Sequence, residues 1–282
     1  MAKRRTPSTS ESAPVAPDTT AATHPTLLAR MAAALREQNW TAIAVEFLVV
    51  AFGVFLGLQA SNWNADLTDR RREAVVLQQI AEDLVQDRRE LAAGRRIAMQ
   101  RIAAANYVLE QATGEPLTAL NVTNAFDSAP GFVSLAVPAT PPLADSAREA
   151  LWSAIVSAYH PSVALPAFDS LVSSGRLDIL RDDALVREIQ QYRLNAAYLA
   201  ATQNETMRSA SVGVRALGEA HGLSAFAPTD AVALVRQVAA SPQLIATIRS
   251  QLGWAVIHVQ RIDAIDQRAA ALQARLPHAD RS

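Results

Sequence analysis

The chain has 282 residues, of which 50% are hydrophobic, only 5% are aromatic and 19% are charged. Alanine accounts for about a fifth of the sequence, and cysteine is absent. The absence of cysteine excludes disulfides, cysteine-ligated zinc, iron–sulfur clusters and a thiol nucleophile. A net charge of −1 gives no reason to expect a nucleic-acid partner. Composition therefore indicates no reaction and no ligand, and the pattern along the chain carries the information.

The chain begins with a polar segment. Residues 1–25 are rich in Ser, Thr, Pro and Ala without an apolar period, so they predict a disordered tail. Residues 26–38 predict a short juxtamembrane helix, because they are amphipathic from position 27 onward.

Residues 39–63 predict a transmembrane helix. The nineteen residues from 47 to 65 are all uncharged, and a helix needs about 20 mainly apolar residues to cross a bilayer. Trp40 and Trp63 bracket the stretch at the two positions where aromatic rings favour the membrane interface. The alternatives are a buried core helix and a cleaved signal peptide, but the preceding polar segment is too long for a signal peptide and the cleavage pattern is poor. We therefore predict a single-pass anchor in the lipid bilayer.

Small residues and one acid share a stripe of this predicted helix. Steps of three or four residues place Glu46, Val50, Gly53, Gly57 and Ala60 on one face. Glycines let two helices approach closely, and a carboxyl group on the same face can hydrogen-bond across the contact. We expect this transmembrane packing face to bind a second copy of the chain or another membrane helix. The alternative for Glu46 is a side chain that reaches the membrane edge.

Positive charges on the two sides of the predicted span are nearly balanced. Before it lie Lys3, Arg4, Arg5, Arg30 and Arg36, and after it lies an arginine triplet at 70–72. The usual outcome for an N-terminal anchor is a short basic tail inside and a large translocated domain. Because arginine replaces lysine almost everywhere, the coding bias indicates a bacterium. We predict an inner-membrane protein with a periplasmic C-terminal domain.

The helical pattern continues beyond the span. No proline occurs between Pro25 and Pro116, and apolar residues recur at helical spacing, so residues 64–113 predict a stalk helix about 75 Å long. Gly94 is a candidate kink. The arginine pairs at 88–89 and 95–96 are expected to be solvated or to contact lipid phosphates.

The rest of the chain predicts a proline-rich loop region at 114–142, a helical bundle domain at 143–276 and a C-terminal tail at 277–282. The expected helices are 145–159, 165–174, 183–220, 229–240 and 241–276. Gly175 suits a left-handed cap, Asp182 and Ser241 suit N-caps, and Gly218 to Gly222 suit a stop. No alternating strand pattern of useful length is found. The fold class is therefore all-α, with a single transmembrane helix continuing into a stalk and a bundle.

Two sequence blocks resemble a bacterial family of uncharacterised single-pass membrane proteins. The first block, 38–64, contains Asn39-Trp40, Glu46-Phe47, Gly57-Leu58-Gln59 and Asn62-Trp63-Asn64. The second, 168–187, contains a helix, the Gly175 cap and a following helix start at Asp182. The resemblance implies a membrane anchor followed by a helical extramembrane domain. It implies no activity, because the family is a domain of unknown function.

The sequence shows no catalytic constellation. The histidines His24, His160, His221, His258 and His278 lie far apart, so we expect capping or surface positions and no metal site. Nucleotide-binding and serine-hydrolase motifs are absent, and no cofactor is predicted. The adjacent acids at 82–83 and at 182–183 point to different helix faces and therefore do not form an acid–base pair. We expect the first pair to be exposed to solvent and the second pair to cap a helix.

Asp169, Arg176 and Asp178 around the Gly175 turn are candidates for a binding patch, with a salt-bridged helix corner as the alternative.

Three functions remain open at this point. The first is an interaction, scaffold or sensor-like module of the bacterial envelope. The second is a pilin-like filament subunit, suggested by Glu46 within an N-terminal apolar helix, although Thr41-Ala42 replaces the processing site and no strand-rich head follows. The third is a membrane-tethered enzyme, which no residue pattern supports. We predict the first function and no enzymatic activity.

Overall fold

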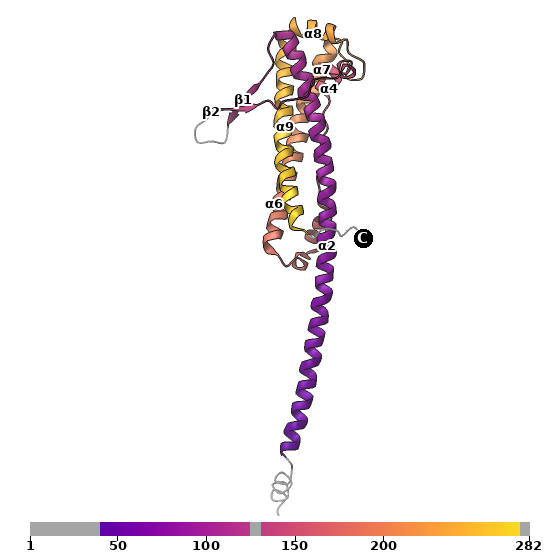
Figure 1. The fold of residues 1–282 in the computed structure, drawn as a ribbon, viewed down its shortest axis with the longest axis vertical. Helices are drawn as coiled ribbons and strands as arrows, with labels where there is room; N and C mark the ends of the chain where they lie inside the picture. Colours follow the sequence, from indigo (N-terminus) through magenta and orange to yellow (C-terminus); the bar gives the residue numbers. More distant parts are fainter. Residues whose placement is uncertain (1–39, 125–130, 277–282) are drawn as a thin grey trace, which may run out of the picture. The chain divides into compact units, whose positions relative to one another are not determined.

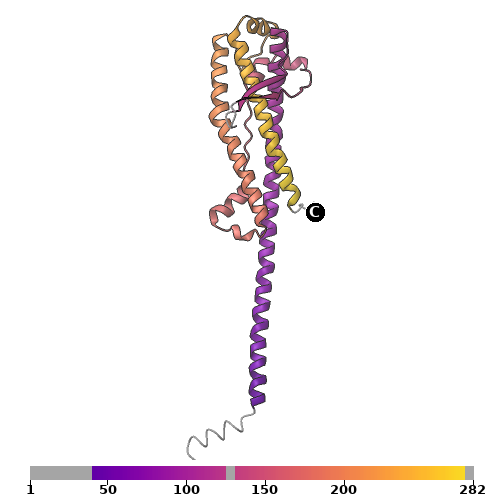
Figure 2. The ribbon, with the colours of Figure 1, turned by 90° about the vertical axis from the view of Figure 1, so that its left-hand side faces the viewer.

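A computed structural model describes residues 40–124 and 131–276 (Figures 1 and 2). The predictions for 1–25, 26–38 and 277–282 lie outside the described residues. The chain divides into two units, Met1–Ala65 and Asp66–Ser282, and each is considered by itself. The described chain is predominantly helical, as the sequence predicts.

Helix α2, Trp40–Thr113, is unbroken along its whole length. Gly94 lies inside it and does not end it, so the helix does not break there. Gly94 instead allows a close approach, because a Cβ atom there would lie 2.9 Å from Cδ and Cγ of Pro161. The glycine makes room for a neighbouring segment of the chain.

The second unit contains seven further α-helices in the described residues. They are α3 Asp145–Arg148, α4 Leu151–Val156, α5 Pro166–Ser174, α6 Asp183–Ala201, α7 Arg208–Ala220, α8 Ala231–Ala239 and α9 Pro242–Arg275. Their ends carry the caps that the sequence predicts. Gly175 takes a left-handed φ of 68°, and Oδ1 of Asp182 accepts hydrogen bonds from the backbone N–H groups of Ala184 and Leu185. Ser241 caps α9 through the N–H of Leu244.

A β-hairpin corrects the prediction of a loop without strands. Strand β1, Ala119–Asn124, pairs antiparallel with β2, Gly131–Ala136. The register places Val122 opposite Val133. Leucine and valine alternate with polar residues along β1, which is a strand pattern, but six residues are too few to stand out in a proline-rich region.

The predicted helix 145–159 is also corrected. It is divided into α3 and α4 because the carbonyl of Glu149 accepts a hydrogen bond from Thr229 N–H, 2.7 Å away. It ends at Val156, three residues before the predicted end at Tyr159, because Ser157 already takes an extended conformation with a ψ of 139°. Residues 157–165 form a non-helical segment that we call the strap.

Two acids of α2 hold the strap and the start of α5. Asp87 is 2% exposed; its Oδ1 accepts the N–H of Ala164 at 2.9 Å, and its Oδ2 accepts the hydroxyl of Tyr192 at 2.8 Å. Asp83 accepts the N–H of Ala167 at 3.0 Å, so its expected solvent role was wrong. Burial raises the pKa of both carboxyl groups.

Figures 1 and 2 both show α9 beside the 66–113 part of α2. Ion pairs join the two helices at two levels. Arg88 Nε lies 2.9 Å from Asp266, and Arg95 Nε lies 2.7 Å from Asp263. These two arginines are therefore paired across an antiparallel helix contact rather than only solvated or lipid-bound.

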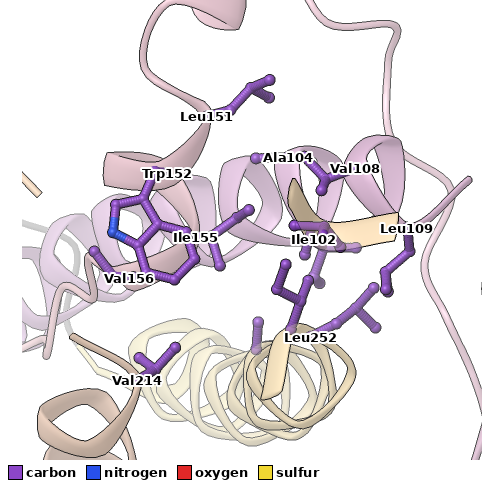
Figure 3. Close-up of a cluster of buried hydrophobic side chains, with 14 of the residues drawn as sticks. Ile102, Ala104, Val108, Leu109, Leu151, Trp152, Ile155, Val156, Val214 and Leu252 are labelled. Carbon is purple, nitrogen blue, oxygen red and sulfur yellow. The ribbon is translucent and has the colours of Figure 1, made fainter. Parts of the chain in front are cut away.

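The buried side chains form two hydrophobic clusters. The first joins α2, α4, α7, α8 and α9, and Figure 3 shows Ile102 of α2 and Leu252 of α9 pointing toward each other within it. The second joins α2, α5, α6 and the C-terminal part of α9. On α9, the first cluster reaches Val259 and the second begins at Ile262. The two hydrophobic clusters therefore meet near position 260 of α9.

Candidate functional site

The predicted transmembrane packing face lies on α2 within the first unit. Val50 is 60% exposed, and a Cβ atom built on Gly53 or Gly57 would meet no atom of the described residues within 4 Å. Gly53 also lines a shallow apolar groove, together with Val45, Leu48, Val49, Phe52 and Leu56. Glu46 and Ala60 are exposed on the same helix. The face is open to a partner, but no contact in the described residues tests it.

The predicted binding patch is spread over several contacts. Asp169 forms an ion pair with Arg193 of α6. Arg176 lines a groove that also contains Arg71 and Arg72 of α2. Asp178 lies in a short 3₁₀ helix, Leu177–Ile179. No hydrogen bond or ion pair joins Asp169, Arg176 and Asp178 within the described residues, and the patch stays a prediction.

The structure reveals a different cluster of polar side chains inside the second unit, near the level at which the two hydrophobic clusters meet. It brings together five side chains, four of which are 4% exposed or less: Arg101 of α2, Gln203, Ser211 of α7 and His258 of α9, with the less buried His160 of the strap. Sequence reasoning placed His160 and His258 at caps or on the surface. That expectation was wrong for His258, which is 3% exposed.

Arg101 is the most unusual member of the cluster. Its Nε donates to the backbone carbonyl of Ile155 at 2.9 Å, and its Nη2 is buried with no hydrogen-bond partner in the described chain. No carboxylate pairs with it there, although buried charges are normally paired. Burial lowers the pKa of the guanidinium to about 10. The core therefore holds a positive charge that no acid of the described residues balances.

His160 of the strap contacts His258 of α9. Their rings pack edge to face with centroids 6.1 Å apart. Nε2 of Gln203 lies 3.0 Å from Nε2 of His258, so the amide donates to a neutral imidazole whose proton is on Nδ1. Burial, then His160 and Arg101, lower the pKa of His258 to about 4. Burial, then Arg208 and Arg101, also lower the pKa of His160.

A π-helix places Gln203 in this cluster. It covers Thr202–Met207, between α6 and α7, where a single α-helix was predicted. The buried positions Leu199, Gln203, Met207 and Ser211 follow each other at intervals of four residues. An α-helix would rotate such a series away from the core, whereas the wider π turn keeps it facing inward. π-Helical turns inside α-helices are frequent at functional sites.

A cavity of about 410 Å³ opens beside the cluster. Its walls come from the end of α4, the strap, α7 and the loop after α7. The lining residues are Val156, Ser157, Ala158, Tyr159, His160, Arg208, Ser211, Arg215, Ala225 and Phe226. Val156 also belongs to the first hydrophobic cluster and is labelled in Figure 3. The cavity thus joins the polar cluster to the surface of the domain.

The charged lining of the cavity has one sign. Arg208 and Arg215 are both exposed, and neither forms an ion pair among the described residues. Arg208 donates to Asn204 Oδ1 at 3.1 Å, and Arg215 donates to the carbonyl of Ser211 at 3.3 Å. No carboxylate from residues 40–124 or 131–276 lines the cavity. Such a surface attracts anions.

Two more polar atoms beside the cavity lack a hydrogen-bond partner among the described residues. Oγ of Ser211 and Nε2 of His160 are both buried and have no hydrogen-bond partner within the described residues. A leftover polar atom in a core costs free energy unless something pairs with it. Among the described residues no carboxylate orients His160 toward Ser211, so these two side chains do not form the arrangement of a serine hydrolase there.

The described part of the chain contains no group of three or more His, Cys, Asp or Glu side chains able to hold a metal ion. The sequence held one signal for the buried cluster. His258 follows Val256 and Ile257 and precedes Val259, so a polar ring interrupts an apolar run. No protein-family model, curated protein or solved structure matches the chain, and its resemblance to the uncharacterised membrane family stays a prediction.

Proposed function

We propose that the chain is a single-pass membrane protein whose helical second unit acts as an interaction, scaffold or sensor-like module of the bacterial envelope. One observation carries this proposal. Helix α2 contains an 18-residue stretch with a mean hydropathy of 2.2, and none of that stretch is buried.

The exposed side chains of this stretch explain why a membrane suits it. Phe47 is 72% exposed, and Phe52 is 63% exposed. Leaving such side chains in water costs about 1.5 to 3 kcal/mol each relative to burial. A continuous apolar surface of this size is unusual on a soluble monomer and marks an interaction with a protein or a membrane.

A second pair of helices has enough apolar length only as a bent unit. Helices α8 and α9 meet at 110°, and together they reach the length and hydropathy of a span. Their apolar faces are already covered, because Leu234, Val238 and Leu252 are 1% exposed or less. They are better explained as core helices, which leaves one span in the proposal.

The arginine-lined groove supports contact with lipid. Arg71 and Arg72 follow the proposed span by several residues, and both line the same groove as Arg176. Arginines just beyond a span reach headgroup phosphates with their long side chains. The proposal therefore includes an anionic bilayer surface as a partner.

Membrane topology is the decisive test of the proposal. Reporters fused after Ser282 should be active if they work in the periplasm and inactive if they work in the cytoplasm. Extraction of the membrane fraction with alkaline carbonate should leave the full chain in the pellet. A chain released into the supernatant would refute the membrane anchor, and the opposite reporter pattern would reverse its orientation.

The Gly53→Ile variant tests self-association through the predicted packing face. Isoleucine fills the apolar groove at Gly53 and is expected to weaken association in a membrane two-hybrid assay by at least about fivefold, because glycine contacts depend on close backbone approach. Val54→Ile, a conservative change next to Gly53, serves as the control. Equal association of both variants and the wild type would rule out this face.

A further inference from the structure

We propose that the cavity between the strap and α7 binds a small organic anion, whose carboxylate or phosphate group meets Arg208 and Arg215 and whose apolar part lies against Val156 and Phe226. All of these residues belong to the 66–282 unit. The inference therefore goes beyond the proposed membrane function and does not depend on it.

The arginines provide the charge for an anion. Arg208 and Arg215 lie seven residues apart on α7, which places them on the same helix face about two turns apart. Neither forms an ion pair within the described residues, so both guanidinium groups keep donors available. A guanidinium group matches the two oxygens of a carboxylate or phosphate.

The inner wall of the cavity carries polar groups that have no hydrogen-bond partner in the described chain. Ser211 is one turn from each arginine on α7, and its buried Oγ has no partner. His160 approaches from the strap with a buried, unpartnered Nε2. Behind the wall, the unpaired charge of Arg101 adds positive potential, which reaches His160. An anion in the cavity would offset this charge and give the leftover groups partners.

The shape of the cavity selects a small molecule with an apolar part. Its volume of about 410 Å³ lies within the range of small-molecule sites. Phe226 is 94% exposed on the loop after α7, although it lines the cavity. An aromatic ring left open to solvent at the rim of a cationic cavity can cover the apolar part of a ligand. An inorganic ion alone would leave this surface unused.

Binding should depend on pH through His160. Arg101 of α2, Arg208 of α7 and His258 of α9 surround its ring, and none of these groups favours its charged form. A bound anion supplies the missing negative charge and favours the imidazolium, so binding takes up a proton. The affinity of wild type is therefore expected to rise as the pH falls from about 7.5 to about 5.5. His160→Gln is expected to flatten this dependence.

Isothermal titration of the full-length chain in an uncharged detergent tests the site. The probes are sodium acetate, benzoate, inorganic phosphate and phenyl phosphate at constant ionic strength, with benzyl alcohol as the neutral counterpart of benzoate. At least one aromatic anion is expected to bind saturably at a single site, at least about tenfold more tightly than benzyl alcohol and than its non-aromatic counterpart. Arg208→Gln with Arg215→Gln is expected to weaken that binding at least about tenfold.

Arg249→Gln is the matched control. Arg249 is an exposed arginine of α9 that does not line the cavity, so this variant should bind as the wild type does. Far-UV circular dichroism confirms the fold of each variant, and the NMR signals of His160 in the wild type should shift on addition of the bound probe. The proposal is overturned if none of the four anions binds, if the double variant binds as the wild type does, or if benzyl alcohol binds as tightly as benzoate.

Discussion

Gly218→Ala is expected to destabilise the second unit by about 3 kcal/mol, because the added methyl group has no space. A Cβ atom at Gly218 would lie 2.1 Å from Cζ2 and 2.6 Å from Cε2 of Trp152. Trp152 is fully buried in the first hydrophobic cluster, so its ring cannot move aside without disturbing neighbours such as Val214 (Figure 3). The free energy of unfolding, measured by urea titration in an uncharged detergent, should show the loss.

Two further variants separate this steric cause from a general effect of alanine. Gly213 lies on the same helix, and a Cβ atom there would meet nothing within 4 Å. Gly213→Ala is expected to stabilise the unit by up to about 1 kcal/mol, because alanine favours helix. Trp152→Phe is expected to reduce the cost of Gly218→Ala, since the smaller ring leaves space for the methyl group. A cost at Gly218 that is the same beside phenylalanine as beside tryptophan would contradict the explanation.

The local elements of the fold could be predicted because their causes are local. Gly175, Asp182 and Ser241 act at helix ends, where the residue type by itself decides the cap. The long apolar stretch of α2 was predictable for the same reason. The hairpin was missed because each strand has only six residues, and its pairing joins segments that neither strand indicates alone.

Contacts between distant segments were not predictable from one sequence. Gly218 belongs to the predicted stop of α7, which ends at Ala220, but its packing against Trp152 was not predictable because Trp152 is far away in the chain. Asp83 and Asp87 were not expected to hold the start of α5 and the strap, because their partners at 167 and 164 become neighbours only after folding. The π-helix changes which side chains after Leu199 face the core. A pattern search with the α-helical period of 3.6 residues cannot predict this change.

The candidate site was missed for the same physical reason. Arg101, His160 and His258 come from three distant segments, and only His258, which interrupts an apolar run, differs locally from a surface residue. Only the fold shows that Arg101 is 4% exposed and that no acid accompanies it in the described residues. A buried charge without a partner is informative because it costs free energy that folding must offset.

The burial of His258 in the same cluster should make the free energy of unfolding of the domain sensitive to acid. The pKa of His258 in the folded chain is about 4, below its ordinary value of 6.5, because burial disfavours the imidazolium. The unfolded chain therefore binds the proton more tightly than the folded chain does. The stabilisation is fully present above about pH 6.5 and is lost as the pH falls toward about 4. The pKa difference corresponds to about 3 kcal/mol of unfolding free energy.

Other titratable groups also change the unfolding free energy with pH, but their effects are present both with and without His258. The lowered pKa of His160 acts in the same direction, whereas the raised pKa values of Asp83 and Asp87 favour the folded chain as acid is added. His258→Gln isolates the contribution of His258, because glutamine keeps a hydrogen-bond acceptor for Gln203 and has no charged form.

Urea titrations of wild type and His258→Gln between about pH 7.5 and pH 4.5 measure the effect of His258. Wild type should lose between about 2 and 3 kcal/mol more than the variant over this range, because the unfolded state gains the proton at position 258 almost completely and the folded state only in small part. An NMR titration of the His258 ring in the folded chain should show no protonation above about pH 5. Parallel pH profiles of the two proteins, or a His258 ring that titrates near its ordinary pKa, would show that solvent or a partner group reaches the cluster and relieves the cost of its charge.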